Sequence, residues 1–163
     1  MTFKKWLLTP VLFFIAFSLS AQNAAELDAM LEAGAISAAA AARFVLGAAD
    51  LLPQELSGQE AEQAAYDMAL SKGWVNTAAN SSITLKDTAL LVMRAFDFKG
   101  GVLYRIFHNS RYAYREMIYR RLIQGKADPN MSVSGPRLLQ IISKSLSYAG
   151  KDDILDAQPQ EQE

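Results

Sequence analysis

One short segment of the 163-residue chain concentrates the side chains best suited to binding chemistry. Between Tyr104 and Arg115 it interleaves three tyrosines with three arginines and holds the sole histidine. Arginine makes planar, bidentate hydrogen bonds to carboxylate and phosphate groups, and tyrosine offers a large stacking surface. The segment therefore predicts a binding surface for sugar rings, carboxylates or phosphate, made by Arg105, His108, Arg111, Tyr112, Tyr114 and Arg115.

The same residues also have a structural interpretation. The tyrosines would pack in the core with their hydroxyls at its edge, and the arginines would pair with acids such as Asp67, Asp87 or Asp97. Arg111 and Arg115 are four residues apart, so they share a helix face. Several bases near the start of a helix oppose its dipole, so internal acids or an anionic ligand should compensate them.

The sequence offers little for catalysis. A Ser-His-Asp arrangement would have to use His108, and nothing resembles a nucleophile elbow. A zinc site needs several ligands at set spacing, and no such cluster exists in a chain without cysteine. The pair Gly100-Gly101 lacks the lysine of a phosphate loop. We therefore predict a non-enzymatic protein with no catalytic residue, no metal ligand and no cofactor.

The elements around this segment form a helix, a polar loop and a second helix over residues 103–146. Gly125 is expected to end the first helix in the left-handed conformation, and residues 128–130 give a turn. Ser134 stands at an N-cap position, and Pro136 falls in the first helical turn, where its missing N–H is tolerated. The second helix has an apolar stripe of Leu138, Leu139, Ile141, Ile142 and Leu146.

Two earlier stretches of the chain repeat this unit. The pair Ile83-Thr84 stands 50 residues before Val133-Ser134, and Ile36-Ser37 stands 47 residues before Ile83-Thr84. Each unit has a short helix stopped by glycine, an aliphatic residue, a Ser or Thr cap and an amphipathic helix. Leu52-Pro53 and Gly100-Gly101 are predicted to end the second helices of the first two units.

The repeats predict an all-α domain, residues 22–150, because a single helical hairpin cannot cover its own apolar stripe. Its three helix-loop-helix units span about residues 26–52, 60–99 and 103–148 and are expected to pack as a pseudo-threefold bundle.

This unit resembles the S-layer homology (SLH) repeat. The likeness covers about residues 26–148 and is best between Leu122 and Ser134, through the Asp-Pro-Asn loop. It implies three tandem repeats in a compact helical bundle with approximate threefold symmetry, anchored to cell-wall polysaccharide. The chain has diverged from the family's Thr-Arg-Ala-Glu signature, of which only the cap hydroxyl remains in all three units, at Ser37, Thr84 and Ser134.

Residues 1–21 have the pattern of a secretory signal peptide. Lys4 and Lys5 precede a short apolar run, and small residues follow, so cleavage is expected after Ser20 or Ala21. The run is shorter than the roughly 20 residues that a membrane span needs, although an uncleaved anchor is the alternative. The absence of cysteine excludes a disulfide framework and a lipid-modified cysteine. The mature chain is therefore expected to be exported, periplasmic or envelope-associated, with no transmembrane span.

Charge is distributed unevenly along the chain. Residues 22–98 hold ten acids and four bases, residues 99–146 hold nine bases and two acids, and residues 147–163 hold five acids and one base. A basic part of this kind suggests internal pairing or an anionic partner, and export makes nucleic acid a poor candidate. Residues 151–163 are predicted to form an acidic disordered tail.

Together these features favour a non-catalytic binding or scaffolding module of the bacterial cell envelope. Its expected ligand is wall polysaccharide or another anionic glycan. One alternative is an accessory or structural subunit that binds an envelope protein, and a large exposed apolar patch would favour it. A second alternative is a small hydrolase of unrecognised type, which would need a pocket holding His108 beside a carboxylate.

Overall fold

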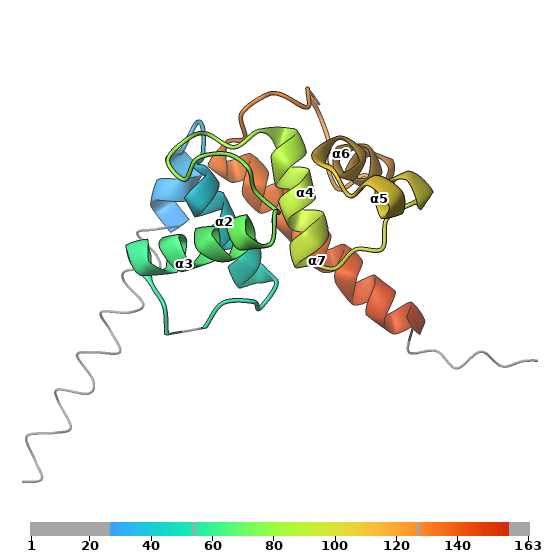
Figure 1. Cartoon of the computed structure of the whole chain (residues 1–163), viewed down its shortest axis with the longest axis horizontal. Helices are drawn as coiled ribbons and strands as arrows, with labels where there is room; N and C mark the ends of the chain where they lie inside the picture. Colours follow the sequence, from blue (N-terminus) through green and yellow to red (C-terminus); the bar gives the residue numbers. More distant parts are fainter. Residues whose placement is uncertain (1–26, 54, 127, 157–163) are drawn as a thin grey trace, which may run out of the picture.

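The computed structural model describes residues 27–53, 55–126 and 128–156 (Figure 1). These residues form helices joined by loops, and the predicted all-α class is confirmed: no β-strand occurs among them, only two isolated β-bridges. The predicted signal peptide and residues 157–163 of the predicted tail lie outside the described ranges. The helices are a short one over residues 27–32, α2 (Ala38–Ala48), α3 (Gly58–Ser71), α4 (Leu85–Ala95), α5 (Val102–Phe107), α6 (Ser110–Tyr119) and α7 (Gly135–Asp156).

Three loop segments, far apart in sequence, meet in a closed ring of backbone hydrogen bonds. The N–H of Ile36 donates to the carbonyl of Val133 at 2.8 Å, and the N–H of Val133 donates to the carbonyl of Ile83 at 3.2 Å. The N–H of Ile83 donates to the carbonyl of Ile36 at 3.0 Å, which closes the ring. All three side chains are buried. Buried backbone groups need partners, and here three residues satisfy one another without a sheet.

A second set of bonds surrounds this ring two residues further along each segment. Ala38 donates its N–H to the carbonyl of Ser81, and Leu85 donates to that of Met131, both at 2.9 Å. In the third segment Gly135 donates to the carbonyl of Ala33, also at 2.9 Å. The starts of α2, α4 and α7 are therefore each tied by their backbone to a neighbouring loop.

Each of these three helices begins directly after a hydroxyl residue, as the sequence predicts. The Ser37 side chain accepts a hydrogen bond from the Ala40 N–H at 3.1 Å, and Thr84 accepts one from the Asp87 N–H at 3.4 Å. Ser134 immediately precedes α7, and its carbonyl accepts a hydrogen bond from the Leu138 N–H at 2.9 Å. Such caps satisfy N–H groups that have no partner within the helix.

Helices α2, α4 and α7 contact one another, while α3 packs on α2 and α6 packs on α4. In Figure 1 α4 runs between the α2–α3 pair and the α5–α6 pair, and α7 passes beneath it. The core is one contiguous cluster to which these helices and the ring segments contribute. Its largest fully buried side chains are Leu46, Ile83, Leu85, Leu91, Met93, Met117, Leu138 and Ile141.

Three helices end earlier than the sequence predicts. The ends expected at Leu52-Pro53 and Gly100-Gly101 are wrong, because α2 stops at Ala48 and α4 at Ala95. Asp50 and Asp97 then take the left-handed conformation, with φ of 56° and 49°. Aspartate tolerates this region better than most residues, so both helices end without the proline or the glycines that the prediction used.

The helix expected to end at Gly125 also stops early. Tyr119 is the last residue of α6, and Arg121, with φ of 58°, takes the left-handed position. The N–H of Leu122 then donates to the carbonyl of Met117 at 2.9 Å, which closes the helix end. Gly125 does have a left-handed φ, of 80°, but it lies in the loop beyond. Gly73, with φ of 66° directly after α3, does end its helix, as predicted for the first helix of each unit.

At the other end of the domain, α7 is longer than expected. It continues to Asp156, whereas the predicted tail begins at residue 151. Lysine and aspartate after Gly150 are compatible with a helix, so nothing in this stretch stops α7 at residue 150. The boundary expected between domain and tail therefore falls inside a helix.

Gly135 gives a direct test of the central packing. A Cβ atom at this position would lie 1.6 Å from the carbonyl oxygen of Met30, and backbone cannot move aside as a flexible side chain can. Gly135→Ala should therefore lower the free energy of unfolding by about 3 kcal/mol or more, measured by chemical denaturation.

Gly150→Ala is the matched control, because it makes the same change in the same helix. No atom lies within 4 Å of a Cβ placed there, so alanine should raise stability by about 0.5–1 kcal/mol through its better helix propensity. Equal effects of the two substitutions would show that Met30 does not pack against Gly135.

Candidate functional site

The stretch from Tyr104 to Arg115, which we call the basic aromatic segment, falls on two short helices with a sharp turn between them. Helix α5 ends at His108, which has a left-handed φ of 44° and donates its N–H to the Tyr104 carbonyl at 2.8 Å. Helix α6 follows at Ser110, where the Asn109 side chain accepts a hydrogen bond from the Tyr112 N–H at 3.1 Å. The turn gives α5 a direction of its own, separate from α6.

Aromatic contacts hold the two helices together. The Tyr104 ring is buried and meets His108 edge to face, with centroids 5.7 Å apart. Phe107 stacks on Tyr112 at 5.2 Å, which joins the end of α5 to the first turn of α6. A Cβ at Gly100 would lie 2.3 Å from Tyr104, so the glycine before α5 makes room for this ring. Tyr104 therefore belongs to the core, in agreement with the structural interpretation of that tyrosine.

A groove of about 280 Å³ lies between α5 and α6. Of the six predicted ligand-binding residues, Tyr112 and Arg115 line it. Val102, Leu103 and Tyr119 also line it, and none of these three is among the predicted binding residues. Tyr119 is 84% exposed, which is unusual for a tyrosine, and its place four residues after Arg115 on the same helix is the sequence signal that points to it.

The other four predicted residues divide into two groups. Arg105, His108 and Arg111 are exposed on α5, on the turn and on α6, outside the groove. Tyr114 is half-buried and packs against the core instead. Burial raises the pKa of its hydroxyl, nearby Asp128 raises it further, and Arg137 opposes both. The structure therefore places Tyr114 beside the loop before α7 and away from the groove.

The arginines of this region have two different environments. Arg120 pairs with Glu116 at 2.8 Å and lies 4.9 Å from the centre of the Tyr148 ring. By contrast, Arg105, Arg111 and Arg115 form no ion pair or hydrogen bond with any carboxylate of the described residues. Glu116 is the one acid of α6, and Arg120 already binds it. These three arginines therefore have no carboxylate partner in the described part of the chain.

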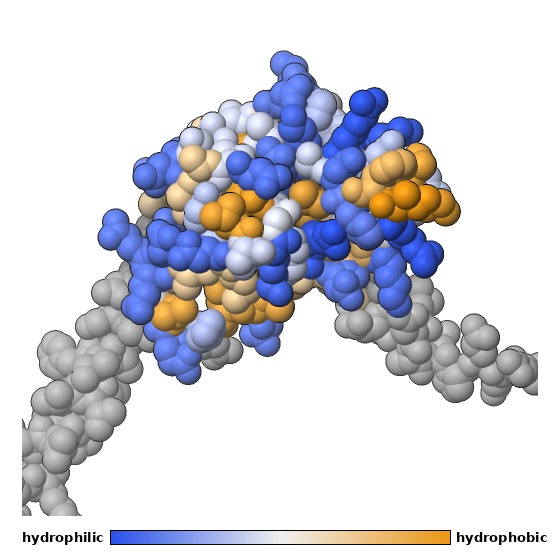
Figure 2. Space-filling model, viewed as in Figure 1, coloured by the Kyte–Doolittle hydropathy of each residue, from blue (hydrophilic) through white to orange (hydrophobic). Residues whose placement is uncertain are grey.

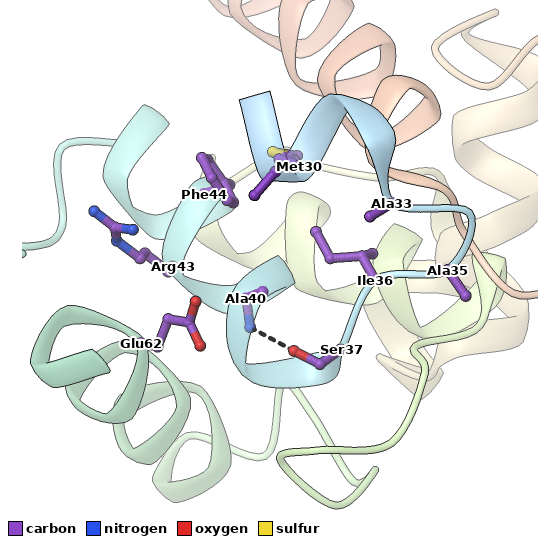
Figure 3. A pocket seen from close by; sticks show the side chains of 10 residues that line it. Met30, Ala33, Ala35, Ile36, Ser37, Ala40, Arg43, Phe44 and Glu62 are labelled. Carbon is purple, nitrogen blue, oxygen red and sulfur yellow. Dashed lines mark hydrogen bonds between the residues drawn. The ribbon is translucent and has the colours of Figure 1, made fainter. Parts of the chain in front are cut away.

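Two other concavities lie on the opposite side of α4. One, of about 240 Å³, lies over the cap of α2, with Met30, Ile36 and Phe44 as its apolar lining (Figure 3). Arg43 from α2 and Glu62 from α3 supply its charges. The second, of about 420 Å³, has an apolar lining that includes Leu52, Leu56, Leu139 and Ile142. Neither contains a residue of the basic aromatic segment.

Within the described ranges, no three His, Cys, Asp or Glu residues gather closely enough to hold a metal ion. None of the helices in that same part of the chain is long and apolar enough to cross a membrane. Comparison of the chain with protein-family models, curated proteins and solved structures found no match.

The Tyr104 hydroxyl provides a test of the site's internal packing. It is buried and has no hydrogen-bond partner among the described residues, and an unpaired buried hydroxyl is costly. Tyr104→Phe should therefore raise the free energy of unfolding by about 1 kcal/mol, measured by chemical denaturation at pH 7.

The same variant should change the response to alkali. Burial raises the Tyr104 pKa above its usual 10, helped by Asp97 and opposed by Arg94. The folded state therefore holds the phenol proton more tightly than the unfolded chain does. Its stability is intact below pH 10 and falls as the pH rises towards the raised pKa. The phenylalanine variant should lose less stability in that window, and a variant less stable than the parent at pH 7 would show that the hydroxyl has a partner.

Proposed function

We propose that this protein is an exported, non-catalytic binding or scaffolding module of the bacterial cell envelope. It attaches through the surface of α5 and α6 to an anionic component of that envelope. The observation that carries the proposal is the exposure of Arg105, Arg111 and Arg115 without a carboxylate partner in the described part of the chain, beside a groove with aromatic walls. Arg111 also lies in the first turn of α6, where a base opposes the helix dipole and an anionic ligand would compensate it.

We further propose that the domain consists of three SLH-like repeats. The closed ring supports this, because Ile36, Ile83 and Val133 occupy the same position before the cap in each unit. The second set of bonds also supports it, since Ala38, Leu85 and Gly135 each donate from two residues further on. Wall polysaccharide is the anionic component that the resemblance suggests.

The proposed attachment is electrostatic and aromatic. Arginines bind carboxylate and phosphate groups in pairs of hydrogen bonds, and tyrosines stack on sugar rings. Arg115 and Tyr112 are brought together in the groove, and Arg111 lies one helical turn before Arg115. The exposed position of His108 gives no support to a hydrolase, because no carboxylate of the described residues hydrogen-bonds it.

One observation favours a second candidate, an accessory subunit that binds an envelope protein. Helix α5 exposes several large apolar side chains, and such patches mark interaction surfaces. A protein partner would cover them, so the apolar and basic parts of the surface require separate variants.

Processing of the N-terminus tests the exported location. Signal peptidase should cleave after Ser20 or Ala21, so the protein isolated from the producing cells should begin at Ala21 or Gln22. Mass spectrometry of the intact protein identifies the N-terminal residue from the molecular mass. A membrane-bound form that retains Met1 would show an uncleaved anchor in place of a signal peptide.

The double variant Arg111→Ala, Arg115→Ala tests the binding surface. Both side chains are exposed and unpaired in the described structure, so the melting temperature should stay within about 2 °C of the parent. Sedimentation with isolated envelope fragments should become about tenfold weaker, and added salt should weaken the parent in the same way.

Arg121→Ala, Lys126→Ala is the matched control, because it removes the same charge from exposed side chains outside the groove. It should bind envelope fragments as the parent does. Equal losses in the two double variants would indicate that only net charge matters and that α6 holds no specific site.

A further inference from the structure

We infer that the tip formed by α5 docks into the surface of an anionic lipid bilayer, so that lipid, not glycan, is the envelope component bound. The inference rests on the proposed function, because it assigns the ligand of the same surface. Four large apolar side chains of α5 are unusually exposed: Val102 by 71%, Ile106 by 63%, Phe107 by 55% and Leu103 by 49%. We call these four residues the α5 apolar face.

The α5 apolar face is contiguous. With about 100° between successive residues of a helix, Val102, Ile106, Leu103 and Phe107 fall on one arc of about 140°. Tyr104 lies outside this arc and turns into the core, where it is 4% exposed. Tyr104 attaches α5 to the core and the Phe107–Tyr112 stack joins it to α6, so Val102, Leu103 and Ile106 are left as exposed apolar side chains.

The position of α5 suits a flat, soft partner. Its main helix neighbour is α6, and it stands at the edge of the molecule opposite the α2–α3 pair (Figure 1). In Figure 2 a hydrophobic patch lies over α5, with hydrophilic residues around it. A projecting apolar tip is a shape that can enter a bilayer surface, whereas a hydrated glycan would leave much of it in water.

Basic residues lie close to the α5 apolar face in the sequence. Arg105 lies on α5 itself, His108 stands at its end, and Arg111 and Arg115 follow on α6. The three arginines have no carboxylate partner among the described residues, so they can meet lipid phosphates as the apolar face enters the acyl region. Tyr119 lines the groove beside Val102 and Leu103, and a tyrosine is well suited to the headgroup level. Charge and apolarity thus point to the same anionic surface.

The experiment measures cosedimentation of the processed protein, purified from the producing cells, with vesicles of two compositions. One set contains phosphatidylglycerol and phosphatidylcholine, and the other contains phosphatidylcholine alone. The test variant is Val102→Ser, Ile106→Ser, which changes the two most exposed residues of the face and leaves the Phe107–Tyr112 stack intact. The control, Leu70→Ser, Leu146→Ser, removes two exposed leucines from α3 and α7.

The parent and the control should bind the anionic vesicles, bind neutral vesicles far less, and lose affinity as salt rises. The test variant should bind the anionic vesicles at least about tenfold more weakly than the parent, because two side chains no longer bury apolar surface in the lipid. Equal binding by test variant and parent would overturn the inference.

Two further outcomes separate the inference from the proposed function. If the parent sediments with purified wall polysaccharide but not with anionic vesicles, the inferred bilayer contact is wrong, whereas the proposed function as an envelope-binding module is retained. A parent that binds neither would overturn both. Analytical ultracentrifugation tests whether a second copy of the chain binds the α5 apolar face instead. A dimeric parent and a monomeric test variant, with no vesicle binding by the parent, would assign the face to a dimer interface and overturn the inference.

Discussion

The mutual satisfaction of three buried backbone segments is the constraint on which the rest of this structure depends. Ile36, Ile83 and Val133 are buried among helices, where no sheet is available to provide hydrogen-bond partners for their backbone N–H and carbonyl groups. Each donates to one neighbour and accepts from the other, so removing any one segment would leave unpaired groups on both of the others. The residue after each of them is a helix cap, so the ring also determines where α2, α4 and α7 begin.

This centre leaves α5 with an unusual role. The helices that leave the ring pack in the core, and α3 and α6 cover α2 and α4. The turn at His108 separates α5 from α6, and Tyr104 and the Phe107–Tyr112 stack hold α5 in place. Most of the other apolar residues of α5 are therefore left exposed to solvent. Its exposed face is therefore available for binding, as the proposed bilayer contact requires.

The beginnings of α2, α4 and α7 were predictable from the sequence, and most of the helix ends were not. Ser37 and Thr84 cap helices because their hydroxyl groups accept hydrogen bonds from nearby backbone N–H groups. This preference is local, so it can be read from the sequence without knowing the fold. The ends at Asp50, Asp97 and Arg121 use left-handed residues other than glycine, which local sequence does not mark. At Asp97 and Arg121 the buried residue after the turn decides where the helix ends, since Phe98 and Leu122 reach the core only if the helix closes before them.

The candidate site was predictable in its composition but not in its geometry. Residue types alone selected the arginines and tyrosines, yet only packing separates Tyr112, in the groove, from Tyr114, which faces the loop before α7. The exposed α5 face escaped prediction because apolar residues at helical spacing usually indicate a core helix. Nothing in residues 102–107 shows that the buried side of the helix is Tyr104.

The arginines show how one residue type serves two purposes within a few residues of sequence. Arg120 binds Glu116 and the Lys99 carbonyl, and Arg137 binds the carbonyls of Gln124 and Lys126, so both hold loops in place. Their side chains are partly buried, where a charge without partners would be costly. Arg105, Arg111 and Arg115 remain in water, where an unpaired charge costs little, so the fold can keep them without partners. Stability therefore accounts for the first pair and not for the other three, and it is those three that lie close to the α5 apolar face in the sequence.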